Sequence, residues 1–188
     1  MKQKSIHNFV SDQLSDWSLA SGNFKALESV LVRDVEINGL TVKYQFNPAR
    51  MISSAAKLSK EAIASRKCFL CEQNRPAEQI WQVFHAENGS EYHVLVNPYP
   101  IFPDHLVIAR SEHTDQTIMG SYEDMLELAH AYQDMVIFYN GPKSGASAPD
   151  HHHFQAAPHG TIPLVSDVDT DVQKVCEPII SGPNSSLS

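Results

Sequence analysis

The sequence lacks an excess of positive charge. It contains 14 Lys and Arg residues against 22 Asp and Glu residues, which gives a formal net charge of -8. Non-specific nucleic-acid binding needs a basic surface that neutralises phosphates, so the composition argues against this class of partner. A small anionic ligand remains compatible with the sequence, because local hydrogen-bond donors hold such a ligand whatever the total charge is.

Long apolar runs and a cysteine framework are also missing. No run of 18 apolar residues occurs, so we expect no membrane span. The opening residues, MKQKSIHNFVSDQLSDW, have no continuous apolar core of the kind that a secretory signal carries. The three cysteines, two of which form the pair Cys68-x-x-Cys71, do not resemble a disulfide framework, and a reduced cytoplasmic location fits better.

The remaining composition is that of an ordinary globular chain. Of the 188 residues, 42% are hydrophobic and 19% are charged, which is sufficient for a buried core. No internal repeat is visible. We expect one domain over residues 1–175, in which residues 1–40 supply an N-terminal helix and the start of a hairpin, and a flexible tail over residues 176–188.

The first part of the chain predicts helix and then hairpin. Residues 5–30 favour one or two helices, with possible caps at Ser11 and Ser21. The alternating segments LVRDVEI and LTVKYQF flank Asn38-Gly39, a pair typical of a tight hairpin turn. Residues 49–67 predict a loop and a short helix that begins near Ser59.

The second part predicts a sheet with a long helix. We expect strands at residues 80–86, 92–97, 105–110 and 154–158, and a helix over residues 121–140 because its apolar positions follow helical spacing. This order predicts an α+β fold, an antiparallel sheet with helices packed mainly on one face.

Three consecutive histidines stand out in GASAPDHHHFQAAPH, residues 145–159. The run is internal, unlike a purification tag. In a strand, alternate residues face the same way, so His151, His153 and Gln155 would share one face and His152 would point to the other. Imidazole can attack phosphorus near neutral pH, and an amide can donate to a phosphoryl oxygen. The alternative is that these are ordinary surface or core histidines.

Other residues offer donors or charge for phosphate oxygens. The loop before the histidines contains Gly145 and Ser147, which supply backbone and hydroxyl donors. Arg50 and Lys143 are candidate counter-charges, and a solvated surface position is the alternative for each of them.

Cys68 and Cys71 have the spacing that chelates zinc. A structural site needs four ligands, so this pair alone leaves three interpretations open: half of a zinc site, two buried thiols that pack as small apolar groups, or a redox pair.

Four segments together resemble a known family. FYNGPKSGASAPDHHHFQ resembles the active-site stretch of the galactose-1-phosphate uridylyltransferase branch of the histidine-triad (HIT) superfamily, which ends in His-x-His-x-Gln. NPYPIFPDHLVIARSEHTDQ resembles the strand–bend–strand unit of that superfamily, CFLCEQNRP its Cys-x-x-Cys segment, and YQFNPAR a nucleotide-side segment of its phosphorylases. The resemblance covers about residues 42–165 and is strongest to bacterial proteins close to the GDP-hexose phosphorylases.

The resemblance implies a HIT-like fold and a nucleotidyltransferase or phosphorylase. Its substrate would be a nucleoside diphosphate sugar or a dinucleoside polyphosphate, and a nucleotidyl-histidine would be the intermediate. His153 matches the nucleophile and Gln155 the amide that contacts the transferred phosphoryl group. Asn140 and Ser147 match phosphate-contacting positions. His105 matches a histidine near the nucleotide, although a hydrogen-bonded histidine at a strand start fits equally well.

The resemblance also supplies a ligand set and a partner. His113 and His151 match two further metal ligands, which would complete a structural Zn²⁺ site with Cys68 and Cys71. Superfamily members commonly form homodimers by pairing their sheets. The transferases have Pro and Gly where this chain has His152 and Phe154, and they carry a second half. Two alternatives stay open: a nucleotide hydrolase, in which water is the acceptor, and a zinc-stabilised nucleotide-binding module without turnover, which the missing second half favours.

Overall fold

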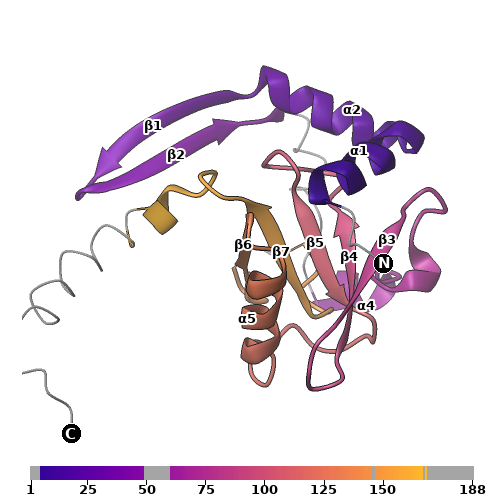
Figure 1. Cartoon of the computed structure of the whole chain (residues 1–188). Coiled ribbons are helices and arrows are strands. Elements are labelled where there is room, and N and C mark those ends of the chain that lie inside the picture. The colour runs from indigo at the N-terminus through magenta and orange to yellow at the C-terminus, as the bar shows by residue number, and fades with distance from the viewer. Residues whose placement is uncertain (1–4, 49–59, 145–146, 167, 169–188) are drawn as a thin grey trace, which may run out of the picture. The chain divides into compact units, whose positions relative to one another are not determined.

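The computed structural model describes residues 5–48, 60–144, 147–166 and 168 (Figure 1). The chain divides into two compact units, one of Met1–Val30 with Asn47–His159 and one of Leu31–Phe46 with Gly160–Ser188. None of the helices in the described ranges combines the length and the apolar character that crossing a bilayer requires. The predicted tail at 176–188 and the domain boundary at residue 175 lie outside the described residues, so both stay predictions.

The first unit contains a five-stranded sheet in the order β3-β4-β5-β7-β6. Every neighbouring pair of strands is antiparallel. The strands are β3 (Trp81–His85), β4 (Glu91–Val96), β5 (Leu106–Arg110), β6 (Met135–Phe138) and β7 (His153–Pro158). The helices are α1 (Ile6–Asp16), α2 (Ser18–Ala26), η1 (Leu27–Ser29), α4 (Lys60–Ser65), η3 (Glu72–Asn74) and α5 (Tyr122–Ala131).

The N-terminal residues form two helices, as predicted, but the predicted caps are wrong. Ser11 lies inside α1 and Ser21 inside α2. The cap of α1 is Ser5, whose side chain accepts a hydrogen bond from the Asn8 N–H at 3.4 Å. The two helices are separated at Trp17, which has an extended backbone and a side chain that is 5% exposed.

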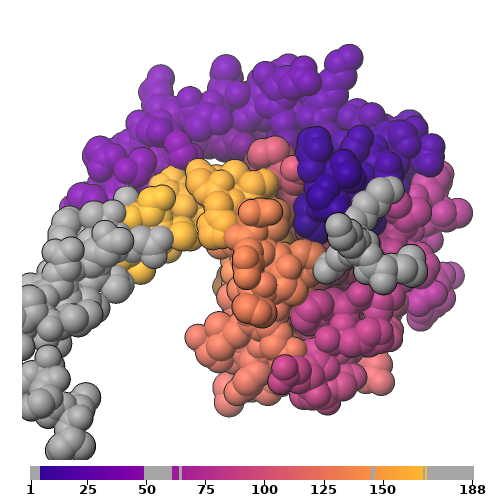
Figure 2. Space-filling model, viewed as in Figure 1, coloured from indigo at the N-terminus to yellow at the C-terminus, as the bar shows by residue number. Residues whose placement is uncertain are grey.

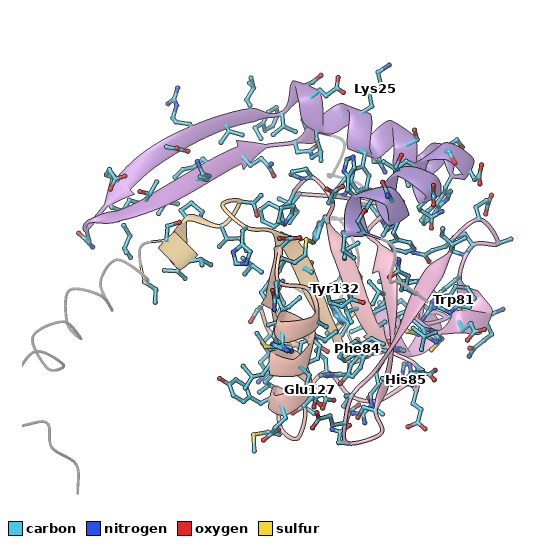
Figure 3. All side chains as sticks on the ribbon, in the orientation of Figure 1. Lys25, Trp81, Phe84, His85, Glu127 and Tyr132 are labelled. Atoms are coloured by element: carbon cyan, nitrogen blue, oxygen red, sulfur yellow. The ribbon has the colours of Figure 1, made fainter. Side chains whose placement is uncertain are left out.

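The main core lies on one face of the sheet. The two-residue period of β4 and β5 turns alternate side chains to this face, where α1 and α5 cover them. The fully or almost fully buried members include Phe9, Val10, Tyr92, Val94, Val96, Leu106, Ile108, Leu128, Phe154 and Ala156. At its rim the rings of Phe84 and Tyr132, labelled in Figure 3, have centroids 6.3 Å apart. The predicted α+β class, with helices mainly on one face, is confirmed.

The helix predicted over residues 121–140 is too long. α5 ends at Ala131, and Met135–Phe138 form the edge strand β6. All four residues of β6 are apolar, so helical and strand periods both fit this short run in the sequence. Pairing with β7, from Met135 opposite Pro158 to Phe138 opposite Gln155, decides for the strand.

The opposite face of the sheet carries the Cys-x-x-Cys segment in place of a long helix. Cys68, Leu70 and Cys71 form a second, smaller cluster with Leu95 and Ala109 of the central strands. α1 and α5 occupy the viewer's side of this unit in the space-filling view (Figure 2). The two faces of the sheet therefore carry a large core under α1 and α5 and a smaller cluster around the Cys-x-x-Cys segment.

The described part of the second unit includes the predicted hairpin, β1 (Leu31–Ile37) and β2 (Leu40–Phe46), as a two-stranded sheet. Asn38 and Gly39 both have positive φ angles, 53° and 82°, as the predicted tight turn requires. The register places Leu31 opposite Phe46 and Ile37 opposite Leu40, so the apolar residues gather on one side of the ribbon.

Candidate active site

Four potential metal ligands converge beside the sheet. One ligand atom from each of Cys68, Cys71, His113 and His151 lies within 4.8 Å of all the others. The Cys68 Sγ is 3.3 Å from the His151 Nδ1, and the Cys71 Sγ is 3.2 Å from the His113 Nδ1. The two Nδ1 atoms are 3.2 Å apart. Three separate segments of the chain thus meet in a Cys2His2 cluster that could hold a metal ion.

The chemistry of this donor set fits a tetrahedral cation. Ligand bonds of about 2.0–2.3 Å give tetrahedral edges of roughly 3.3–3.8 Å, close to the separations between these atoms. The His151 Nε2–H donates to the Arg110 carbonyl at 2.8 Å, which leaves the Nδ1 lone pair directed at the cluster. Burial, with a contribution from Cys68, raises the pKa of the Cys71 thiol to about 11. A bound cation would reverse this and stabilise the thiolate.

His153 begins β7 on the same face as the cluster. Its side chain is 5% exposed. The ring Nδ1–H donates to the His151 carbonyl at 2.8 Å, and because a carbonyl only accepts, Nδ1 carries the proton. Nε2 therefore holds the lone pair, and no partner for it occurs among the described residues. Burial lowers the pKa of His153, which favours the neutral ring.

Gln155 follows His153 at the two-residue spacing of the strand. Its Oε1 accepts a hydrogen bond from the His105 Nε2–H at 2.9 Å. The His105 Nδ1 accepts a hydrogen bond from the Ile101 N–H at 3.1 Å, so the proton of the neutral ring lies on Nε2 and Nε2 is the donor. The amide nitrogen of Gln155 is thereby turned away from His105. His105 itself is fully buried, so it reaches the open side of the site through Gln155.

The other predicted phosphate contacts lie around the loop between β6 and β7. Asn140 is half-buried just beyond β6, and Lys143 is exposed in the turn that follows. Ser147 is exposed, and its carbonyl accepts from Arg66 Nη2, which also pairs with Asp150 Oδ1 at 2.7 Å. The predicted contacts Gly145 and Arg50 lie outside the described residues.

His152 points away from this site, as the alternation of side chains along the strand predicts. Its ring packs against Tyr92 and Phe154 in the core under the helices. Both ring nitrogens are buried, and neither has a hydrogen-bond partner within the described part of the chain. Burial, with the nearby Arg110, lowers the pKa of His152 to about 4.

Two residues near the site had no role in the sequence interpretation. The Gln116 side chain bonds to the backbone of both His153 and Asn140. Arg66 ties the segment before Cys68 to the loop before His151. Only the position of Gln116, three residues after His113, could have drawn attention to it, because its partners come from distant parts of the chain.

Comparison with known families matches one model, a domain of unknown function (DUF4922), over residues 9–158. The chain belongs to the DUF4922 family. The match begins within α1 and spans the five-stranded sheet and all described site residues of this DUF4922 chain.

Two curated proteins of Saccharomyces cerevisiae are similar to part of the DUF4922 chain. Protein APA1 is 29% identical over 93 residues, and diadenosine 5',5'''-P1,P4-tetraphosphate phosphorylase 2 is 32% identical over 94 residues. Each match covers 43% of this chain and 29% of the yeast protein. The chain thus matches less than a third of the length of these relatives.

A solved structure has the same fold. The crystal structure of yeast Ap4A phosphorylase Apa2 in complex with Ap4A matches with a TM-score of 0.51 and 21% sequence identity. The match covers 89% of this chain and 56% of the yeast chain. The HIT-like fold predicted from the sequence is confirmed.

Proposed function

We propose that this DUF4922 protein is a nucleotidyltransferase of the phosphorylase type that works through a nucleotidyl-histidine. The observation that carries the proposal is the state of His153. Its Nδ1–H donates to the His151 carbonyl, which leaves the lone pair on Nε2, and Gln155 lies two residues further along the same strand. A dinucleoside polyphosphate is the favoured substrate, because one yeast relative is named for diadenosine tetraphosphate phosphorolysis.

The reaction would proceed as two displacements at one phosphorus. In the first, the lone pair of His153 Nε2 attacks the α-phosphorus, a P–N bond forms, and the P–O bond to the leaving phosphate group breaks with its electron pair. In the second, an oxygen of inorganic phosphate attacks the same phosphorus, and the P–N electron pair returns to Nε2. Dividing one difficult displacement into two lowers the barrier of each.

The chain's own donors would stabilise the phosphoryl oxygens. Gln155, two residues after His153 in the strand, would donate through its amide nitrogen, because its Oε1 is held by His105. Asn140, Lys143 and Ser147 lie in the loop between β6 and β7 and are further candidate contacts to phosphate oxygens. Gly145 and Arg50 are proposed in the same role from the sequence. Donors fixed before the substrate arrives contribute most to catalysis of this kind, because they need no reorganisation during the reaction.

We infer that the Cys2His2 cluster holds a structural Zn²⁺. Cys68, Cys71, His113 and His151 would be its four ligands, so no coordination position would be left for water. A bound zinc would supply a cross-link between three chain segments and no chemistry at phosphorus. The carbonyl of His151 orients His153, so the cluster would also help to position the nucleophile.

Transfer to phosphate is favoured over transfer to water because residue 155 is a glutamine. A neutral imidazole at this place could act as the base for an attacking water, whereas an amide cannot. GDP-hexoses and other nucleoside diphosphate sugars are the second substrate class in the proposal, on the strength of the sequence resemblance.

A cytoplasmic homodimer completes the proposal. β3 is an edge strand of the sheet, and Ile80, Trp81 and Val83 at this edge are exposed apolar residues. Such an edge is suited to pairing with a second copy.

A direct test is covalent capture of the intermediate. The protein would be incubated with diadenosine polyphosphates and nucleoside diphosphate sugars, quenched cold, and mapped by peptide mass spectrometry at a pH that preserves phosphoramidates. We expect a nucleotide on His153. His153→Ala should abolish the adduct, whereas the exposed histidine variant His130→Ala should retain it. An adduct on His151 or His152 would contradict the assignment, and binding without any adduct would favour a binding module.

A further inference from the structure

The strands β6 and β7 part at the active site. Their ladder ends with Phe138 opposite Gln155. Continued in the same register, Asn140 would stand opposite His153, yet these two residues do not pair as strand residues. A gap therefore opens between the strands, at the two positions where the proposed nucleophile and a proposed phosphate contact stand.

The side-chain amide of Gln116 bridges this gap. Its Nε2 donates to the Asn140 carbonyl at 2.9 Å and to the His153 carbonyl at 3.0 Å. Its Oε1 accepts the His153 N–H at 2.8 Å. The side chain is 3% exposed, so water does not compete for these bonds.

We propose that Gln116 is a positioning residue of the active site: its amide holds His153 and Asn140 at a fixed separation where their strands part. The inference rests on the proposed function. Gln116 fixes both backbone polar groups of His153, and the His151 carbonyl fixes the ring Nδ1–H. With these three contacts made, the ring keeps one orientation and its Nε2 remains available. Gln116 touches no reacting atom, so it acts through the two residues that it holds.

The chain offers a matched control in Gln13. This glutamine is 1% exposed, and its amide also bridges two backbone groups. Its Nε2 donates to the Glu78 carbonyl at 2.7 Å, and its Oε1 accepts the Ile80 N–H at 2.8 Å. The bridge joins α1 to the segment before β3 and lies outside the candidate site. Loss of either bridge removes similar hydrogen bonds, but only one of them positions the nucleophile.

The experiment compares Gln116→Met and Gln116→Glu with Gln13→Met and Gln13→Glu. Glutamate keeps the acceptor for the His153 N–H and loses both donations, and it serves as the second variant should methionine prevent folding. We expect kcat on the substrate that gives the adduct to fall about ten- to hundredfold in the Gln116 variants, with KM within about twofold. The Gln13 variants should lose comparable thermal stability and keep kcat within about twofold of the parent. Equal kcat in the two sets would overturn the inference.

A second readout does not depend on turnover. Long-range ¹H–¹⁵N spectra of the histidine rings report which nitrogen carries the proton. In the parent and in the Gln13 variants, His153 should be protonated on Nδ1 alone; in the Gln116 variants a mixture should appear. If the parent shows no turnover but the Gln116 variants still show the tautomer mixture, the proposed function is rejected and the positioning role is supported. An unchanged His153 tautomer in the Gln116 variants would overturn the positioning role.

Discussion

At the residue scale, His152 is a histidine buried in the core, and its burial affects the stability of the fold. His151 and His153 belong to the proposed site, whereas the ring of His152 lies among aromatic side chains, and neither of its nitrogens has a hydrogen-bond partner in the described residues. The burial that lowers its pKa to about 4 makes protonation costly in the folded state. The unfolded chain takes up that proton near pH 6.5, so this histidine destabilises the fold as the pH falls from about 6.5 toward 4.

His152→Phe should remove this acid sensitivity. Between pH 7.5 and pH 5, the parent should lose roughly 1–2 kcal/mol more of its free energy of unfolding than the variant loses. Urea unfolding at the two pH values measures the difference, and any loss of metal at low pH is common to both proteins. The exposed His130→Phe serves as the control and should match the parent. Equal pH dependence in His152→Phe and the parent would contradict the burial argument.

Gln155→His tests the choice of acceptor. The variant should raise the fraction of nucleotide transferred to water, because an imidazole can take a proton from the attacking water. The ratio of hydrolysis to phosphorolysis products, measured at fixed phosphate concentration, gives the result. Gln155→Asn, which keeps an amide, should leave this ratio near that of the parent. An unchanged ratio in Gln155→His would contradict the proposed role of the amide.

Single residues differ in how far the sequence reveals their roles. The alternation of His151, His152 and His153 follows from the period of a strand, so their separation onto two faces was predictable. Gln116 was not, because its partners, Asn140 and His153, are more than 20 residues away and meet it only in the folded sheet. The tautomer of His153 depends likewise on a backbone carbonyl, and the position of a carbonyl cannot be inferred from residue types.

At the scale of elements, the proposed metal would be a main link between the Cys-x-x-Cys segment and the sheet. It is followed by a single 3-10 turn, Glu72–Asn74, and packs through the small cluster around Leu95 and Ala109. Because this cluster is small, a metal cross-link between the three chain segments would add to the local stability.

Removal of the metal should therefore loosen this segment. We expect untagged protein to contain one zinc per chain, and Cys68→Ser to contain well under half of that amount by elemental analysis. Loss of about 3 kcal/mol should lower Tm by roughly 6–12 °C in a chain of this length. A chelator should lower the Tm of the parent and leave that of Cys68→Ser nearly unchanged. Parent protein with little zinc, or equal zinc in both proteins, would contradict the assignment.

Element boundaries were harder to predict than element types. The hairpin was readable because Asn38-Gly39 fixes its turn locally. The end of α5 was not, since Met135–Phe138 fits a helix or a strand and is decided by β7, a partner 15 or more residues later in the chain. The missed strand β6 is also the strand whose separation from β7 opens the candidate site.

At the scale of the whole molecule, the proposed dimer should depend on the edge strand β3. Val83, 46% exposed, would become buried if two copies paired there. Val83→Lys should shift the dimer toward monomer by light scattering at micromolar concentration, because a buried lysine lacks a partner. Leu126→Lys on the exposed side of α5 should remain dimeric. A monomeric parent would reject the dimer, and a dimeric Val83→Lys would reject this edge.

The order of the sheet has a consequence for synthesis on the ribosome. Of the strands in the described residues, β7 is made last, yet it lies between β5 and β6. The meander of β3, β4 and β5 can pair as it emerges, but β6 has no neighbour until residues 153–158 arrive. A chain stalled before His153 would therefore expose β5 as an open edge and lack the proposed nucleophile. The same late segment would thus close the sheet and supply the proposed nucleophile, so a chain stalled before it should form no nucleotide adduct.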